Sequence, residues 1–225
     1  MKLVLFDIDG TILTSDGAAI RAVNRAFFNI YGIEHAVDGI EAAGRTDPAI
    51  VGDMFTRNLG REHEAHELER LFEEYVKELE AELSGSDGLM IFPGIPELLS
   101  ELSVRDDIVL GIATGNIEPG ARLKLAHSGL NSYFPFGGFG SDSPRREGLI
   151  RIAIERGQSY LPPGVEYEEV IVVGDTHHDI IGGRAAGARV VAVATGTNSM
   201  SELREHDPEH LFADFSNVRS VLEVF

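Results

Sequence analysis

Acidic and polar side chains follow three apolar runs of the chain. They are Asp7 and Asp9 in "LVLFDIDGT", Thr114 and Asn116 in "GIATGN", and Asp175 and Asp179 in "VVGDTHHD". If these segments share one crevice, their carboxylates cannot all stay ionised without a cation, so the pattern predicts a bound metal ion. The chain has no cysteine. Metal ligands would therefore be oxygen or imidazole, and the hard carboxylate oxygens of this set favour Mg²⁺.

The elements that would position these side chains are expected to alternate between strand and helix. Runs rich in β-branched residues predict strands at 3–6, 109–113, 170–173 and 190–194. Helical patterns are expected at 97–103, 121–127, 147–156 and 179–186. This order predicts an α/β fold with a Rossmann-like parallel sheet as its core. Ligands of such sheets bind beyond the carboxyl ends of the strands, where the acids would meet.

One stretch breaks the alternation. Between residues 15 and 87 the sequence predicts only helices, at 18–31, 47–58 and 61–83. We therefore expect two domains: an α/β catalytic core formed by 1–14 and 88–225, and an inserted helical domain formed by 15–87. The loose segment "SGSDGL" at 84–89 marks the second boundary.

Composition narrows the class of protein. The 225 residues carry a formal net charge of −18, which argues against nucleic acid as a partner because binding to phosphate backbones needs clustered Lys and Arg. No apolar run approaches the ~18 residues of a membrane span, so we expect no membrane partner and a cytoplasmic location. The oligomeric state cannot be predicted from the sequence.

The ordered motifs resemble a known family. "DIDGT" at 7–11, a strand ending in Thr114, a later basic residue and "GDTHHD" at 174–179 resemble the four motifs of the haloacid dehalogenase-like hydrolases, in particular the phosphoglycolate phosphatase-like branch. The resemblance covers nearly the whole chain and implies a phosphatase. The inserted helices would then form a cap that closes over the site and excludes water.

The resemblance implies a role for each acid. Asp7 would attack phosphorus and form an aspartyl-phosphate. Asp9 would act as general acid and base, protonating the leaving oxygen and later taking a proton from water. Mg²⁺ would lie between Asp7, the main-chain carbonyl of Asp9 and Asp175, with Asp179 acting through water or orienting the ligands.

The second motif would bind the phosphate. Thr114 would donate its hydroxyl to a phosphate oxygen, with the amide of Gly115 close by. Asn116 would orient either Asp7 or the substrate.

The third motif departs from the family pattern, which usually has a lysine there. The chain has three lysines, and none fits: Lys2, Lys77 and Lys124. Lys124, for example, lies only 10 residues after Thr114. We expect Arg146 to stabilise the charged phosphoryl group instead, with Arg145 as the alternative.

Substrate choice is expected to depend on the inserted domain. Its segment "AAGRTDPAI" at 42–50 is the predicted specificity loop, in which Arg45 and Thr46 would contact the substrate. Asp47 could equally be the N-cap of the helix that follows, in which Pro48 suits the first turn.

Several alternatives remain open at this point. An EF-hand calcium loop at 7–18 is disfavoured because its twelfth position is Ala18 rather than Glu. The adjacent His177 and His178 are expected to be exposed or to begin a helix. The main prediction is a Mg²⁺-dependent phosphatase of a small phosphorylated metabolite: phosphoglycolate, a sugar phosphate, a nucleotide or pyrophosphate. A phosphosugar mutase or an inorganic pyrophosphatase of the same family, and a binding protein with a decayed site, are the alternatives.

Overall fold

The structure, a computed structural model, describes residues 1–85 and 88–225. Its larger part is a six-stranded sheet in the order β5-β4-β1-β6-β7-β8, with every neighbouring pair parallel. The strands are β1 (Lys2–Phe6), β4 (Ile108–Ala113), β5 (Gly137–Gly138), β6 (Glu169–Gly174), β7 (Arg189–Val193) and β8 (His210–Phe212). The predicted α/β fold with a Rossmann-like parallel sheet is therefore confirmed.

The central strands are apolar apart from Lys2 and Glu169 at the starts of β1 and β6, because helices cover both faces of the sheet. Along β1, Val4 and Phe6 join one buried cluster, while Leu3 and Leu5 join the cluster on the opposite face. This alternation is the two-residue period of a strand applied to a sheet with two buried faces.

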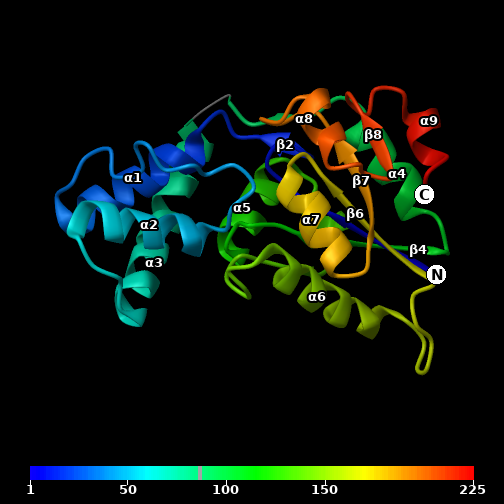
Figure 1. Cartoon of the computed structure of the whole chain (residues 1–225), viewed down its shortest axis with the longest axis horizontal. Helices are drawn as coiled ribbons and strands as arrows, with labels where there is room; N and C mark the ends of the chain where they lie inside the picture. Colours follow the sequence, from blue (N-terminus) through cyan, green and yellow to red (C-terminus); the bar gives the residue numbers. More distant parts are fainter. Residues whose placement is uncertain (86–87) are drawn as a thin grey trace.

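The helices form the outer layers (Figure 1). The first cluster is covered by α4 (Ile95–Ser103), α5 (Glu118–His127) and α9 (Val218–Leu222). The opposite face is covered by α6 (Arg146–Gly157), α7 (His177–Ala185) and α8 (Met200–Glu205). Short 3₁₀ turns follow α5 and α6, at Asn131–Tyr133 and Gln158–Tyr160.

Three helices lie to one side of the sheet, at the left of Figure 1. They are α1 (Ala18–Tyr31), α2 (Asp47–Leu59) and α3 (Ala65–Gly85), and we call residues 18–85 the helical unit. They pack around their own buried cluster, in which the rings of Phe27 and Phe55 meet edge to face with centroids 5.5 Å apart. A short antiparallel pair, β2 (Leu13–Thr14) and β3 (Met90–Ile91), lies where the chain leaves and re-enters the sheet domain. The boundary predicted at residue 87 falls outside the described residues.

Some elements differ from the sequence-based expectation. The third helix begins at Ala65 instead of residue 61, because Arg61 and the amide of Glu64 both bond to the Glu67 carboxylate and hold residues 61–64 outside the helix. The strands β5 and β8 were not predicted. The glycines of β5 lack the β-branched pattern of a strand. Among the described residues, no helix has the length and apolar character needed to cross a membrane.

Candidate active site

The end of β1 places Asp7 at the centre of the sheet edge. β1 lies between β4 and β6, so the segments that follow these three strands run side by side. The amide of Asp7 donates to the carbonyl of Val173 at 2.9 Å. Gly10 then turns with a φ of 84°, and a Cβ atom there would lie 2.3 Å from a carboxylate oxygen of Asp175. Glycine at position 10 therefore lets the two acidic segments approach each other.

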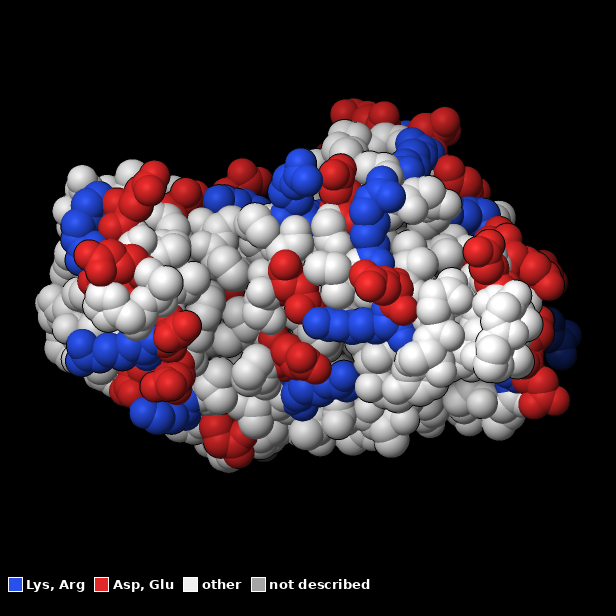
Figure 2. Space-filling view, turned by 90° about the horizontal axis from the view of Figure 1, so that it is seen from below, with Lys and Arg blue, Asp and Glu red and all other residues white. Residues whose placement is uncertain are grey.

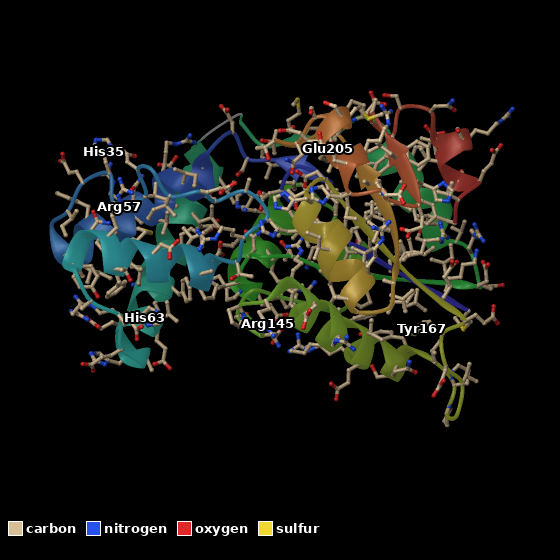
Figure 3. All side chains as sticks on the ribbon, in the orientation of Figure 1. His35, Arg57, His63, Arg145, Tyr167 and Glu205 are labelled. Carbon is tan, nitrogen blue, oxygen red and sulfur yellow. The ribbon has the colours of Figure 1, made fainter. Side chains whose placement is uncertain are left out.

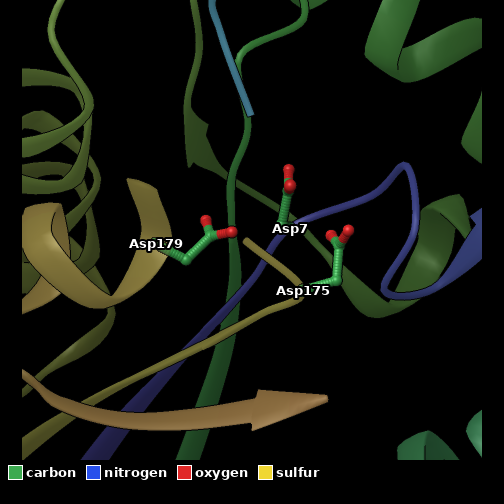
Figure 4. A group of neighbouring side chains, drawn as sticks. All are labelled: Asp7, Asp175 and Asp179. Atoms are coloured by element: carbon green, nitrogen blue, oxygen red, sulfur yellow. The ribbon is translucent and has the colours of Figure 1, made fainter. Parts of the chain in front are cut away.

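Three carboxylates meet at this edge, and we call Asp7, Asp175 and Asp179 the acid group. Each offers an oxygen, and these oxygens all lie within 4.8 Å of one another. Figure 4 shows them converging from the segments after β1 and β6 and from α7. Burial raises the pKa of Asp7 to about 6, against the opposing charge of Arg146. Burial and the charge of Asp179 raise the pKa of Asp175 well above its usual range.

The acid group offers the ligand set of a hard divalent cation, since it supplies only oxygen atoms and resists ionisation without one. Asp179 is the most engaged of the three. Its Oδ2 accepts from the amide of Thr176 at 3.0 Å and from the Thr176 hydroxyl at 2.7 Å, and its Oδ1 accepts from Arg146. Asp175 Oδ1 accepts from the Thr11 hydroxyl at 3.0 Å. Asp7 and Asp175 are thus better placed to ligate an ion than Asp179, which orients the start of α7.

The cation beside the acid group is Arg146, the first residue of α6. Its buried guanidinium lies 2.8 Å from Asp7 Oδ2 and also pairs with Asp179. Burial lowers the pKa of Arg146, but the two carboxylates outweigh this and raise it. The Arg145 side chain is 79% exposed and pairs with Glu147 (Figure 3). Of the two arginines left open by the sequence, the fold brings Arg146 to Asp7.

Asp9 belongs to a second polar cluster, which we call the Asp9 cluster: Asp9, Asn116 and Lys124. The Lys124 ammonium donates to both Asp9 oxygens, at 2.8 and 2.6 Å, and to Asn116 Oδ1 at 2.7 Å. The Asn116 amide donates to Asp9 at 2.7 Å and to the buried Thr114 hydroxyl at 2.9 Å. Asn116 was expected to orient either Asp7 or the substrate. In this structure it contacts Asp9 instead of Asp7.

Sequence reasoning missed Lys124 because it was tested only as the third-motif cation. A different signal could have found it. Lys124 lies three residues after Ala121 and directly before Leu125, and all three are buried on the inner side of α5. A lysine buried on the apolar face of a helix requires an anionic partner, and the partly exposed Asp9 supplies it.

The predicted specificity loop packs against the sheet domain. Thr46 is the N-cap of α2 and donates its hydroxyl to the Pro144 carbonyl at 3.3 Å, so the alternative that Asp47 is the N-cap was wrong. Asp47 instead accepts from the amide of Ile117 at 2.8 Å, and its own amide donates to the Gly115 carbonyl at 2.8 Å. The contact spans the helical unit and the loop after β4.

Arg45 is held within the helical unit. Its guanidinium donates to Asp53 at 2.7 Å and to the carbonyl of Glu41 at 3.0 Å. Part of the residue still lines the cavity described next. Contact with a substrate would require Arg45 to share or exchange these partners.

A cavity of about 490 Å³ connects the two polar clusters. Its floor includes Asp7, Asp9, Thr114, Arg146 and Asp175. Its wall from the helical unit is apolar except at Arg45 and Asp47, and the apolar members are Ala19, Ile20, Ala42, Ala43 and Ile50. The fold therefore places the candidate nucleophile, proton donor and cation in one partly open cavity, beside side chains of the helical unit.

Comparison with known proteins agrees with this arrangement. The family model described as haloacid dehalogenase-like hydrolase matches residues 4–193. The chain is 30% identical to a 5'-nucleotidase of Pseudomonas aeruginosa, over 98% of this chain and 95% of that protein. It is 27% identical to a phosphoglycolate phosphatase of Haemophilus influenzae, over 98% of both chains. The solved structure of a predicted phosphatase from Clostridium acetobutylicum superposes with a TM-score of 0.71 at 21% identity, covering 99% of this chain and 98% of that one. Because the family model spans most of its length, the chain belongs to the haloacid dehalogenase-like hydrolases.

Proposed function

We propose that the protein is a Mg²⁺-dependent phosphatase of small phosphate monoesters. The observation that carries the proposal is the position of Asp7. It is buried at the floor of the cavity, 2.8 Å from the Arg146 guanidinium and within the acid group. Asp9 lines the same cavity. A carboxylate beside a fixed cation, with a second carboxylate within reach of the substrate, is what phosphoryl transfer through an acyl-phosphate requires.

The proposed reaction has two steps. Asp7 attacks phosphorus, the bond to the leaving oxygen breaks, and Asp9 gives that oxygen a proton. A water molecule then attacks the aspartyl-phosphate and gives its proton to Asp9, the bond from phosphorus to Asp7 breaks, and phosphate leaves. Arg146 and Thr114 hold the phosphoryl oxygens. Asp7, the carbonyl of Asp9 and Asp175 would hold Mg²⁺, which when bound offsets the repulsion between Asp7 and an anionic phosphate.

Attraction of the substrate depends on local cations. Figure 2 shows acidic and basic side chains interspersed over one face of the molecule, and the net charge is −18. Salt screens such exposed charges beyond ~8 Å. Arg146, buried beside Asp7, therefore contributes more to phosphate binding than the overall field does.

The lining of the cavity favours an uncharged leaving group. Among the described residues that line it, the cationic side chains are already engaged: Arg45 with Asp53, Lys124 with Asp9, and Arg146 with the acid group. A carboxylate or second phosphate on the leaving group would find no ready partner at the apolar wall. We therefore propose that the helical unit acts as a cap that selects sugar phosphates or nucleoside monophosphates over phosphoglycolate and pyrophosphate.

The test is phosphate release from a panel of these compounds. With Mg²⁺ we expect turnover of the sugar phosphates or nucleoside monophosphates, with kcat/KM higher than for phosphoglycolate or pyrophosphate. Addition of EDTA should abolish phosphate release, and excess Mg²⁺ should restore it. Full activity in EDTA would contradict the metal requirement, and preference for phosphoglycolate would contradict the proposed leaving group.

A further inference from the structure

Lys124 is buried at the edge of the cavity without a role in the reaction described above. Its side chain is only 1% exposed, whereas the Asp9 side chain is 42% exposed. A buried ammonium group is retained only where its charge and hydrogen-bond donors are satisfied. Its partners are therefore a guide to what it does.

The donors of Lys124 are fully used. A lysine ammonium has three N–H donors, and its three close acceptors are Asp9 Oδ1, Asp9 Oδ2 and Asn116 Oδ1, at 2.8, 2.6 and 2.7 Å. A phosphate would have to displace one of these oxygens to bind Lys124. The contacts therefore point to an action through Asp9 and not to phosphate binding.

The same contacts restrain the Asp9 carboxylate. Lys124 holds both of its oxygens, and the Asn116 amide holds Oδ2 from a second direction at 2.7 Å. The stem of Lys124 is fixed in turn by its position on α5 between the buried Ala121 and Leu125. A general acid and base needs such fixed orientation, because proton transfer depends on placement of the carboxylate at the leaving oxygen.

We propose that Lys124 is a positioning residue that orients the Asp9 carboxylate toward the cavity for proton transfer. The proposal rests on the proposed function and extends it to a residue outside the motifs of the sequence. Phosphate binding and attack by Asp7 do not involve Lys124. Loss of its ammonium should therefore slow the proton transfers and leave binding of the substrate largely intact.

The test is Lys124→Met, which removes the charge and keeps a similar apolar stem. On an alkyl phosphate we expect kcat to fall about 10- to 100-fold, part of what general acid and base catalysis contributes, with KM within about threefold of wild type. The first turnover with p-nitrophenyl phosphate should be less affected, because p-nitrophenolate leaves without a proton. Later turnovers should slow, because water must still be deprotonated.

Two further variants make the test specific. Lys77→Met removes a lysine whose side chain is 71% exposed on α3, and it should leave kcat and KM unchanged. In an Asp9→Asn background, Lys124→Met should cause no further loss, because the residue acts through Asp9. A further loss there, an unchanged or raised kcat in the single variant, or a rise in KM without a change in kcat would overturn the proposal.

The outcome also separates this inference from the proposed function. If the wild-type protein releases phosphate from neither ester, both fail. If the wild type is active and Lys124→Met equals it, only the inference fails. Should Lys124→Met not fold, Lys124→Gln, which keeps a donor for Asp9, is expected to give a kcat between those of the wild type and the Asp9→Asn variant, and a wild-type kcat would count against the inference.

Discussion

The groups around Asp7 have opposite effects on its pKa. Burial and neighbouring carboxylates favour its neutral form, while Arg146 favours the ionised form that can act as a nucleophile. Its pKa is raised to about 6 because the effect of burial exceeds that of Arg146. Binding of a divalent cation to the acid group would favour ionisation. Metal binding and activation of Asp7 are therefore expected to be linked.

Asp7→Asn keeps the shape of the side chain and removes the nucleophile. We expect phosphate release to fall by at least ~10³-fold. The melting temperature of the metal-free protein at neutral pH should not decrease, since burial disfavours the charge of Asp7 and Arg146 keeps Asp179 as a partner. Asp106→Asn, at an exposed position, is a matched control and should retain full activity. Substantial residual turnover by Asp7→Asn would exclude its role as the nucleophile.

The sequence was sufficient to predict the acid group because carboxyl ends of parallel strands meet at one edge. It predicted Arg146 as the cation and kept Arg145 as the alternative, because the spacing between motifs does not show which of two adjacent residues faces the site. The spacing of the buried α6 residues could have decided between them, since Leu149, Ile150 and Ala153 follow Arg146 at helical intervals. The partners of Lys124 could not be assigned in this way, because they depend on where α5 packs.

At the scale of elements, the start of α2 is joined to the loop after β4 by Asp47. This carboxylate reaches the amide of Ile117, and burial raises its pKa to about 6, against the lowering effects of Lys124 and of that amide. Thr46 leaves Asp47 free for this contact by capping α2 itself. Helix-cap preferences describe only the residues at one helix end. They could therefore not predict that Asp47 contacts Ile117, which lies 70 residues further along the chain.

Asp47→Asn tests this junction through pH. The ordinary pKa of the carboxyl is 3.8, so between about pH 4 and pH 6 the folded protein holds a proton that the unfolded chain has lost. Its contribution to stability therefore falls as pH rises through this window. Asparagine keeps an oxygen for Ile117 and does not ionise. We expect the melting temperature of the variant, relative to that of the wild type, to increase from pH 5 to pH 7 in a chelating buffer.

Thermal denaturation across this pH range is the measurement for Asp47→Asn. For Asp53→Asn, at an exposed position on the same helix, the melting temperature relative to wild type should not increase over this pH range. Parallel pH curves for wild type and Asp47→Asn would show that Asp47 ionises without cost in the folded protein.

At the scale of the whole molecule, the chain forms two packed units whose relative position completes the cavity. The sequence predicted both from patterning: alternating strands and helices for one, and three helices for the other. The close approach of the two units could not be predicted from side-chain patterns, because it occurs between backbone atoms. A Cβ atom on Gly115 would lie 2.2 Å from the carbonyl oxygen of Arg45. Only glycine, which has no Cβ atom, fits at this junction.

Gly115→Ala should therefore separate the two units without unfolding either. The added methyl would clash with the backbone at Arg45, which cannot move aside as a flexible side chain would. We expect KM to rise about 10-fold or more, because closure of the helical unit excludes water and completes the cavity. Small-angle scattering should show a larger radius of gyration, while circular dichroism should show an unchanged helical content.

Gly52→Ala, on α2, is the matched control. A Cβ atom there meets nothing within 4 Å, and alanine in place of glycine stabilises a helix by about 0.5–1 kcal/mol. Unchanged scattering and KM in Gly115→Ala would mean that closure of the units does not limit catalysis.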